Sequence, residues 1–348
     1  MTSETKLDLT PLIGRVSEGA SLTATEAEGA FATIMSGEAT PVAMAAFLIA
    51  LRTKGLVPSE IAGGVRALRG AMRPVKSERT HELVDTCGTG GGSVRTFNVS
   101  TAAALTAAAA GVRVAKHGNR SFTSQSGSAD VLEALGVRIE LTPDDMSRVL
   151  AETGIVFMFA PLLHPAMRHV GPVRAELAVP TIMNLLGPLT NPAGVTRQLV
   201  GVSDPSWLEL IAPALRELGH RRALVVHGEP GMDELSPVGT TTVSDLRDGE
   251  ITTYPVTPAD LGLEPESLEG LAGGTPGENA VVIVDVLEGR RRDSARSFVL
   301  VNAGATIYVA GLADSLSEGV AMAAEAIDRG LATSKLAELR EATRARGT

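Results

Sequence analysis

The stretch from Val84 to Leu135 decides the fold of this chain. It reads VDTCGTGGGSVRTFNVSTAAALTAAAAGVRVAKHGNRSFTSQSGSADVLEAL, and in it two short apolar segments each end in a polar loop. The first loop carries the glycines Gly88, Gly90, Gly91 and Gly92, and the second reads KHGNR, residues 116–120. An apolar segment, a glycine-rich turn and an alanine run in succession are typical of a strand followed by a helix. Both loops are therefore predicted to follow strands.

The same alternation continues beyond residue 76. Further strands are predicted at 155–159, 199–202 and 222–228, with helical patterns at 130–135, 144–153, 206–218 and 316–329. The segment 279–286 is compatible with a strand or a helix. Alternating strands and helices predict an α/β domain over residues 76–348, with a mainly parallel sheet covered on both faces. Ligands of such sheets bind at the carboxyl ends of the strands, where both loops lie.

Residues 1–75 carry helical patterns and no strand pattern. Thr23 and Glu26 form a capping-box sequence at one helix start, and Pro41 and Pro58 stand at the first turns of two more helices. We expect a small all-helical domain whose apolar face either mediates dimerisation or packs only on its own chain. Six prolines then interrupt the later alternation between 161 and 192. We expect about 163–192 to pack back on the helical domain and to line the cleft between the domains.

The composition excludes several classes of protein. Of 348 residues, 44% are hydrophobic and only 3% aromatic, so the core must consist mainly of alanine, valine and leucine. A net charge of −9 without a basic cluster argues against a nucleic-acid-binding surface. Cys87 is the only cysteine, and the longest run of small apolar residues, 102–110, is too short to span a bilayer. Because the first residues also lack the pattern of a signal peptide, we expect a cytoplasmic protein that binds neither membranes nor nucleic acid.

The glycine loop suits a phosphorylated small molecule. Glycine has no Cβ, so successive N–H groups can curl around an anion. Asn98, Ser100 and Thr101 can cap a helix whose amino end points at the same anion. Every charged residue between Asp85 and Asp130 is basic. The alternative is a tight strand–helix connection without a ligand. A Rossmann fingerprint and a P-loop sequence are both absent.

Asp233 and Glu234 form a second acidic feature, in a turn that follows the predicted strand 222–228. Adjacent carboxylates can hold Mg²⁺, with waters and substrate phosphate completing its coordination shell. A solvated acidic turn explains the pair equally well.

Four motifs show that the chain closely resembles the anthranilate phosphoribosyltransferase family. They are CGTGGGSVRTFNVST (87–101), VAKHGNRSFTSQSGSADVLEALGV (114–137), FMFAPLLHPAMRHVGPVRAELAVPTIMNLLGPLTNP (157–192) and VVHGEPGMDELS (225–236). The resemblance covers almost the whole chain. It implies the fold of the nucleoside phosphorylase and phosphoribosyltransferase type, and a homodimer formed through the helical domain. The implied reaction belongs to tryptophan biosynthesis: 5-phosphoribose passes from phosphoribosyl pyrophosphate (PRPP) to the amine of anthranilate, with Mg²⁺, and pyrophosphate leaves.

The resemblance also implies a set of site residues. PRPP would be held by Gly88, Gly90, Gly91, Gly92, Thr96, Asn98, Val99, Ser100, Thr101, Lys116, His117, Gly118, Asn119, Arg120, Ser121, Ser124 and Ser128. Anthranilate would contact Gly88, Asn119 and Arg174. Mg²⁺ would be coordinated by Ser100, Asp233 and Glu234. Lys116 and Arg174 would act as electrostatic and positioning groups, and no single residue would act as a general acid or base.

Two positions depart from the family pattern. Gly92 stands where the family usually has aspartate, which leaves the magnesium stoichiometry open, and Gln125 stands where it often has lysine. Two other functions stay open as well. A pyrimidine nucleoside phosphorylase would share the fold and a glycine-rich phosphate loop, and a non-catalytic relative would need a basic groove for nucleic acid.

Overall fold

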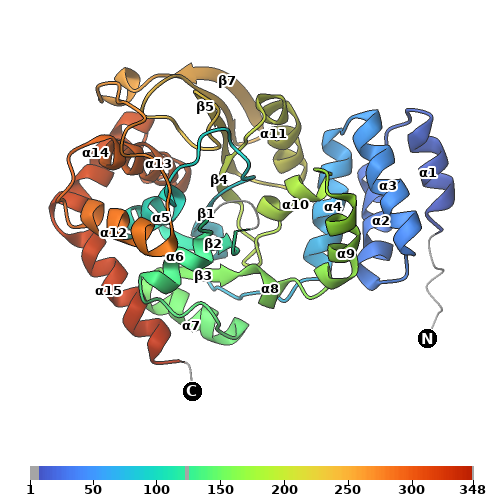
Figure 1. Ribbon diagram of the computed structural model, residues 1–348, viewed down its shortest axis with the longest axis horizontal. Coiled ribbons are helices and arrows are strands. Elements are labelled where there is room, and N and C mark those ends of the chain that lie inside the picture. The colour runs from blue at the N-terminus through green and yellow to red at the C-terminus, as the bar shows by residue number, and fades with distance from the viewer. Residues whose placement is uncertain (1–7, 122–124, 347–348) are drawn as a thin grey trace.

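A computed structural model describes residues 8–121 and 125–346 of the chain. Figure 1 shows a helical domain at one end and a larger α/β domain at the other. Four helices open the chain: α1 (Thr10–Ser17), α2 (Ala24–Ser36), α3 (Pro41–Lys54) and α4 (Pro58–Gly70). The predicted capping box is confirmed, since Thr23 Oγ1 accepts the Glu26 N–H and the Glu26 carboxylate accepts the Thr23 N–H. The first of these helices, α1, was not predicted.

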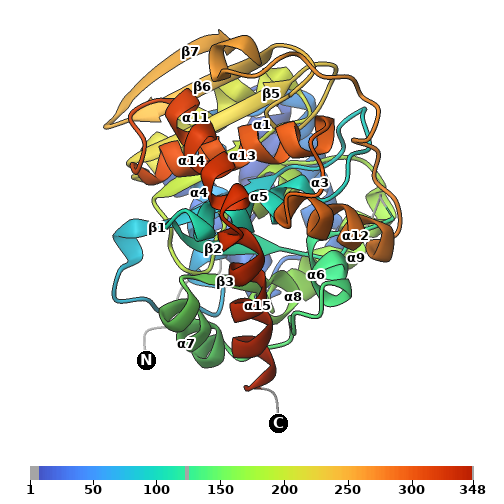
Figure 2. The same ribbon diagram turned by 90° about the vertical axis from the view of Figure 1, so that its left-hand side faces the viewer.

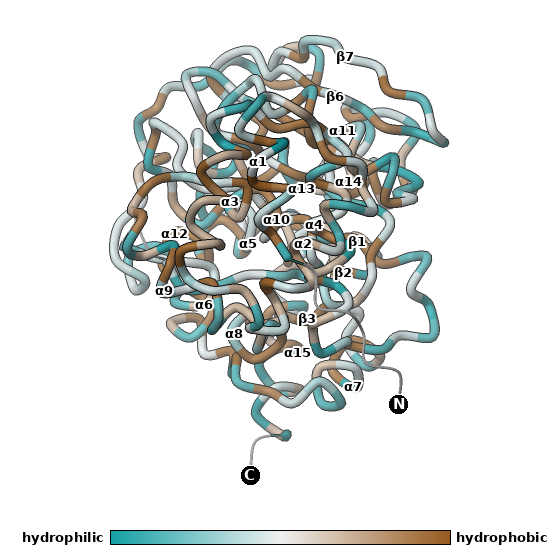
Figure 3. Tube along the Cα trace, turned by 90° about the vertical axis from the view of Figure 1, so that its right-hand side faces the viewer, coloured by the Kyte–Doolittle hydropathy of each residue, from teal (hydrophilic) through white to brown (hydrophobic). Residues whose placement is uncertain are grey.

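The proline-rich segment forms three short helices. They are α8 (Ala160–Leu163), α9 (Met167–Leu177) and α10 (Met183–Leu189). Helix α9 contacts α2 and α3, and α10 contacts α4. In Figure 3, which looks onto the helical end of the molecule, the helices nearest the viewer carry both hydrophobic and hydrophilic residues. The segment therefore adds a layer to a bundle of amphipathic helices.

The α/β domain is built on one seven-stranded sheet in the order β3-β2-β1-β4-β5-β6-β7. The five strands from β3 to β5 are parallel, which confirms the predicted mainly parallel sheet. Strands β6 and β7 add an antiparallel hairpin that was not predicted. The bounds are β1 (Leu83–Gly88), β2 (Arg113–Gly118), β3 (Ile155–Phe159), β4 (Arg197–Gly201), β5 (Arg222–Gly228), β6 (Thr241–Arg247) and β7 (Glu250–Val256).

Helices cover both faces of this sheet. Helices α5 and α13 lie on one face, with α12, α14 and α15 packed around them (Figure 2). Helix α11 lies on the other face and packs on α4 of the helical domain. The bounds are α5 (Val99–Ala109), α6 (Ser128–Ala134), α7 (Pro143–Thr153), α11 (Leu208–Glu217), α12 (Pro276–Leu287), α13 (Ser294–Ala310), α14 (Leu316–Asp328) and α15 (Leu331–Arg344). The ambiguous segment 279–286 is thus helical.

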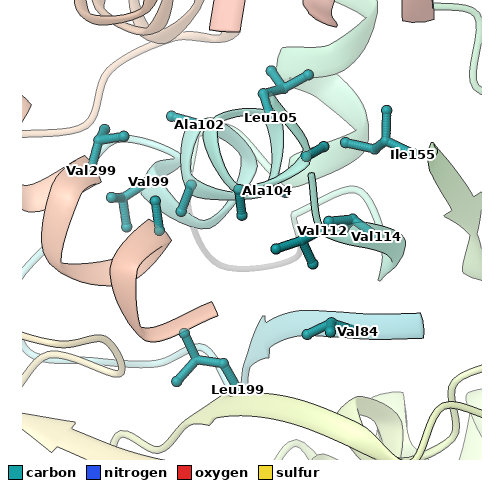
Figure 4. Packing of buried hydrophobic residues seen from close by; sticks show 14 of the residues in the cluster. Val84, Val99, Ala102, Ala104, Leu105, Val112, Val114, Ile155, Leu199 and Val299 are labelled. Carbon is teal, nitrogen blue, oxygen red and sulfur yellow. The ribbon is translucent and has the colours of Figure 1, made fainter. Parts of the chain in front are cut away.

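Alternate residues of the central strands enter two different cores. Leu199 and Leu224 join the core beneath α5 and α13, whereas Val200 and Val225 join the core that contains α11 and the helical bundle. This alternation follows from the period of two in a strand. Figure 4 shows Ala104 of α5 and Val299 of α13 on the same side of the sheet as Leu199. On the opposite face, Val200 and Val225 pack in the same cluster as α11 and the helical bundle, so the helical domain shares a continuous core with that face of the sheet.

The helices of the described part of the chain include none that is long and apolar enough to cross a membrane.

Candidate active site

The glycine loop begins at the point where the strand order reverses. From β1 the chain continues to β2 and β3 on one side, and it then returns to place β4 on the other side of β1. The loops after β1 and β4 meet there: the Thr89 N–H donates to Gly201 O at 2.9 Å, and the Ser203 N–H donates to Thr89 Oγ1 at 3.1 Å. Such switch points are the usual ligand sites of open α/β sheets. The fold thus places the predicted loop where a ligand binds.

Asp233 fits at this switch point because the last residues of β1 and β4, Gly88 and Gly201, have no side chain. A Cβ on Gly88 would lie 2.3 Å from Asp233 Oδ2, and a Cβ on Gly201 would lie 1.5 Å from Asp233 O. The same carboxylate oxygen accepts the Gly90 N–H at 2.8 Å. Residues separated by more than a hundred positions are thereby locked together. The structure joins the predicted glycine loop to the predicted acidic turn.

The two carboxylates of this turn have no cationic side-chain partner in the described part of the chain. Burial raises the pKa of Asp233, and burial together with the charge of Asp233 raises the pKa of Glu234 well above its usual range. Glu234 Oε1 accepts the Thr96 hydroxyl at 3.3 Å. Neither carboxylate forms an ion pair with any residue in 8–121 or 125–346. Two adjacent carboxylates without a cationic side-chain partner suit Mg²⁺, which commonly takes one or two carboxylates and completes its shell with water and phosphate.

Lys116 lies between β1 and the first turn of α5. Its ammonium donates to Thr86 O at 2.7 Å and to Ser100 Oγ at 3.2 Å, and only 4% of the residue is exposed. Burial lowers the pKa of Lys116, while the nearby charge of Asp85 opposes this shift. Burial in turn raises the pKa of Asp85 to about 6. The ammonium is directed at the first turn of α5. A direct contact with the leaving group stays a prediction.

Asn98 does not cap α5 with its side chain, contrary to the expectation from sequence. Its Oδ1 accepts from Ser126 Oγ and from Asn279 Nδ2, both at 2.9 Å, and its Nδ2 donates to Ser126 O at 3.0 Å. The amide is therefore used to join three segments of protein. In the same turn, Val99 is buried, and the buried hydroxyl of Thr101 has no partner among the described residues. Ser100 meets Lys116, and no hydrogen bond links Ser100 to either carboxylate within those residues.

The second loop is held by the start of α6. The Asp130 carboxylate accepts the Gly127 N–H at 2.8 Å and the Ser121 N–H at 3.2 Å, and Ser128 Oγ donates to Asn119 O at 3.3 Å. The close packing requires Gly118, where a Cβ would lie 2.2 Å from Ser128 Oγ. Ser124, also predicted to bind PRPP, lies outside the described residues.

Arg120 is already neutralised in this structure. Its guanidinium lies 2.8 Å from Asp130 Oδ1 and 3.0 Å from Glu133 Oε1, and Cζ lies 5.5 Å from the centroid of the Phe159 ring. It therefore adds no free positive charge at the loop. In the same loop His117 Nε2 lies 3.1 Å from His164 Nε2. Burial lowers the pKa of His117 to about 3 and that of His164 to about 4, so both rings are neutral at pH 7.

Arg174 lies on α9, the helix that packs on α2 and α3. It is half-buried, and burial lowers the pKa of its guanidinium. No hydrogen bond or ion pair to another described residue is formed by this side chain, and none joins it to Asn119. A half-buried guanidinium without a carboxylate partner suits an anionic ligand.

Gly92 and Gln125, the two positions expected to depart from the family pattern, lie in different surroundings. A Cβ on Gly92 would lie 2.9 Å from Gly231 O and 3.3 Å from Asp233 Oδ1, so this position faces the acidic turn. Ser93 reinforces the same contact, because its N–H donates to Gly231 O at 2.9 Å and its hydroxyl to Pro230 O at 3.0 Å. Gln125 is exposed.

Comparisons with known proteins bear on this arrangement. Residues 80–333 match the model of the glycosyl transferase family α/β domain, and residues 10–72 match that of its helical bundle domain. An anthranilate phosphoribosyltransferase from Rhodopseudomonas palustris (strain BisA53) is 50% identical over 96% of this chain and 97% of its own. The chain belongs to the anthranilate phosphoribosyltransferase family. The enzyme from Rubrobacter xylanophilus is 51% identical over 92% of this chain and 94% of its own.

Solved structures of anthranilate phosphoribosyltransferases share the fold over nearly the whole chain. The enzyme from Thermus thermophilus superposes with a TM-score of 0.91 at 45% identity, over 97% of this chain and 100% of that one. The Saccharomyces cerevisiae enzyme, solved in complex with PRPP and Mg, gives 0.87 at 27% identity, over 97% and 98% of the two chains. The same yeast enzyme has also been solved with 4-fluoroanthranilate.

Three asparagine and aspartate side chains that organise this phosphoribosyltransferase site were missed by the sequence reasoning. They are Asp130, which holds the second loop, Asn279, which bonds to Asn98, and Asn302 of α13, which accepts the Leu235 N–H and donates to Leu235 O, both at 3.0 Å. The sequence did contain one signal for the position of Asn279. Thr275-Pro276-Gly277-Glu278 is a capping-box sequence, and the structure shows both of its hydrogen bonds. It identifies 276–287 as a helix whose first turn ends near Asn279.

Proposed function

We propose that this protein transfers the 5-phosphoribosyl group of PRPP to the amine of anthranilate, which gives N-(5-phosphoribosyl)anthranilate and pyrophosphate. The observation that carries the proposal is the contact between Asp233 and the glycine loop at the switch point of the sheet. It brings a carboxylate pair suited to Mg²⁺ against a loop suited to a diphosphate. The strong similarity to anthranilate phosphoribosyltransferases supports the choice of substrates.

The proposed chemistry needs no general base from the protein. The amine of anthranilate is an aromatic amine and is neutral near pH 7, so its lone pair is free to attack C1 of the ribose. The difficult step is departure of pyrophosphate while positive charge develops on the sugar. The N–H groups of Gly91 and Gly92 and the amino end of α5 would hold the diphosphate, because the Gly90 N–H is bonded to Asp233. Arg174 would hold the anthranilate carboxylate and orient the amine.

Mg²⁺ bound at Asp233 and Glu234 would neutralise the diphosphate and make it a better leaving group. Thr96 keeps the Glu234 carboxylate in place through its hydroxyl. Lys116 adds a positive charge behind the first turn of α5. The protein therefore contributes binding, orientation and charge, and proton transfer plays no leading part.

A fluorescence assay tests the proposal. With PRPP and Mg²⁺ the protein should consume fluorescent anthranilate, and the signal should fall with time in proportion to enzyme concentration. Absence of turnover across a wide range of Mg²⁺ concentrations would overturn the assignment. A parallel assay with a pyrimidine nucleoside and inorganic phosphate distinguishes the phosphorylase alternative, for which only this second reaction would proceed.

We further propose that the protein is a cytoplasmic homodimer assembled through the helical domain, with residues 1–75 forming that domain and 76–348 the catalytic one. Val42, on α3 of this domain, leaves 79% of its surface exposed, which supports an apolar contact there. Sedimentation equilibrium of the wild type and of Val42→Glu tests the contact. A monomeric wild-type protein would contradict it.

A further inference from the structure

A short strap in the α/β domain pairs with residues 95–97, which lie between the glycine loop and α5. We define the strap as residues 271–274, which lie between β7 and α12. The Phe97 N–H donates to Leu271 O at 3.0 Å, and the Gly273 N–H donates to Arg95 O at 3.1 Å. These bonds make Thr96 and Ala272 an antiparallel bridge pair. The strap therefore holds the backbone on both sides of Thr96.

Thr96 links the strap to the carboxylate pair. Its hydroxyl donates to Glu234 Oε1 at 3.3 Å, while its flanking backbone is fixed by the strap. A displacement of the strap must therefore move a hydrogen-bond donor of Glu234. The strap approaches very closely, because a Cβ on Gly273 would lie only 2.3 Å from Thr96 O. Glycine is required at 273 by this contact and not by its backbone conformation.

Asn279 of α12 forms hydrogen bonds both to the strap and to Asn98. Its Oδ1 accepts the Gly274 N–H at 2.8 Å, and its Nδ2 donates to Asn98 Oδ1 at 2.9 Å. Only 3% of Asn279 is exposed, and both ends of its amide are used. A single buried side chain thus bridges the strap to Asn98, which precedes the first turn of α5. Buried polar groups that are fully bonded in this way favour one arrangement of the surrounding chain.

We propose that Asn279 and the strap are positioning elements of the PRPP site, which set the glycine loop against the magnesium carboxylates. They act through Asn98 and Thr96, and the strap does not itself supply a group to the substrate. The inference rests on the proposed function for its substrate, and on the contacts alone for the positioning. Loosening the strap should weaken binding of PRPP with Mg²⁺ and leave binding of anthranilate nearly unchanged.

Two pairs of variants test the proposal. Gly273→Ala introduces the clash with Thr96, whereas Gly277→Ala, four residues later in α12, meets nothing within 4 Å and serves as its control. Asn279→Asp keeps the acceptor for the Gly274 N–H and replaces the donor to Asn98 with an oxygen. Its control is Thr153→Val, which removes buried hydrogen bonds to Val149 and Ile155 at the other end of the sheet. Thermal unfolding of all four confirms that they fold.

Asn279→Asp should raise the KM for PRPP about tenfold, the effect of losing one well-made hydrogen bond. Gly273→Ala should raise it at least about as much, because the clash with Thr96 O displaces the strap. The KM for anthranilate should change less than twofold, and the two controls should match the wild type. Equal changes in both KM values, or none, would overturn the positioning role. Isothermal titration with PRPP and Mg²⁺, without anthranilate, should show the same loss.

Hydrogen exchange separates this inference from the proposed reaction. In Asn279→Asp the amides of 95–98 should exchange faster, while the Gly274 amide keeps its protection because its acceptor remains. This measurement needs no substrate, so it tests the positioning role even if the wild type shows no transfer. Unchanged exchange at 95–98 in a folded variant would refute it.

Discussion

Replacing Gly88 with alanine tests how closely the acidic turn must fit the end of β1. A Cβ at this position would lie 2.3 Å from Asp233 Oδ2. Ordinary contact between such atoms begins at 3.4 Å, so the carboxylate or the strand must move by about 1 Å. Asp233 has little freedom to yield, because the same oxygen accepts the Gly90 N–H and its backbone lies against Gly201.

The expected loss follows from this displacement. A misplacement of about 1 Å in an active site can cost a factor of about 100 in rate. Overpacking should also destabilise the fold by about 1–3 kcal/mol. We therefore expect kcat/KM for PRPP to fall about 100-fold and the Mg²⁺ requirement to rise. Gly70→Ala is the control, since a Cβ there meets nothing within 4 Å and the residue ends α4.

A double-mutant cycle decides whether the loss passes through Asp233. If Gly88→Ala acts by moving this carboxylate, then adding it to Asp233→Ala should cost little more than Asp233→Ala alone. Steady-state kinetics at several Mg²⁺ concentrations would measure the three variants. An additive loss in the double variant would refute the reasoning, because it would mean that the alanine damages the loop independently of the carboxylate.

Three further predictions concern single residues. Arg174→Ala should raise the KM for anthranilate at least about tenfold more than the KM for PRPP, because it removes the proposed carboxylate partner; equal increases would contradict that role. Gly92→Asp places a carboxylate beside Asp233 Oδ1 and should shift the Mg²⁺ dependence of the rate, and an identical Mg²⁺ titration would count against it. Burial lowers the pKa of His220 from 6.5 to about 3. Below pH 6.5 this imidazole is therefore protonated in the unfolded chain but stays neutral in the folded protein. The free energy of unfolding therefore decreases as the pH falls from 6.5 towards 3, by about 2 kcal/mol at pH 5. His220→Leu should remove this part of the pH dependence, as measured by urea unfolding. The same decrease in the free energy of unfolding in this variant between about pH 7 and 5 would disprove the role of His220.

The sequence predicted the elements whose signals are local. The glycine and KHGN loops follow their strands, and the helices at Thr23, Pro41 and Pro58 begin where their caps indicate. The β6–β7 hairpin also had a local signal that was overlooked. Asp248-Gly249 forms its turn with both residues at positive φ, which is the preferred sequence of a tight hairpin turn.

The partners of the site side chains could not be predicted in this way. Asn98 looked like a helix cap, but its partners lie 28 and 181 residues further along the chain. Asp233 bonds to Gly90 across 143 residues. Lys116 was expected to act on PRPP as an electrostatic group, and only the packing of β2 beneath α5 shows that it is buried. Local propensity carries no information about such contacts, which arise from the order of the strands.

The glycines of the first loop serve two separate purposes. Gly90 and Gly91 are exposed and have φ of 68° and 83°, so the loop turns at these two positions. The Gly90 N–H is bonded to Asp233, so the N–H groups after it are those that can face an anion. Gly88 and Gly92 do not have positive φ, and a Cβ on either would meet the 231–233 turn. They make room for the turn that carries Asp233. An aspartate at position 92 would need Gly231 to withdraw, and Ser93 holds Gly231 in place through two hydrogen bonds. Gly92 and Ser93 therefore act together, and Gly92→Asp should be accommodated best when Ser93 is replaced as well.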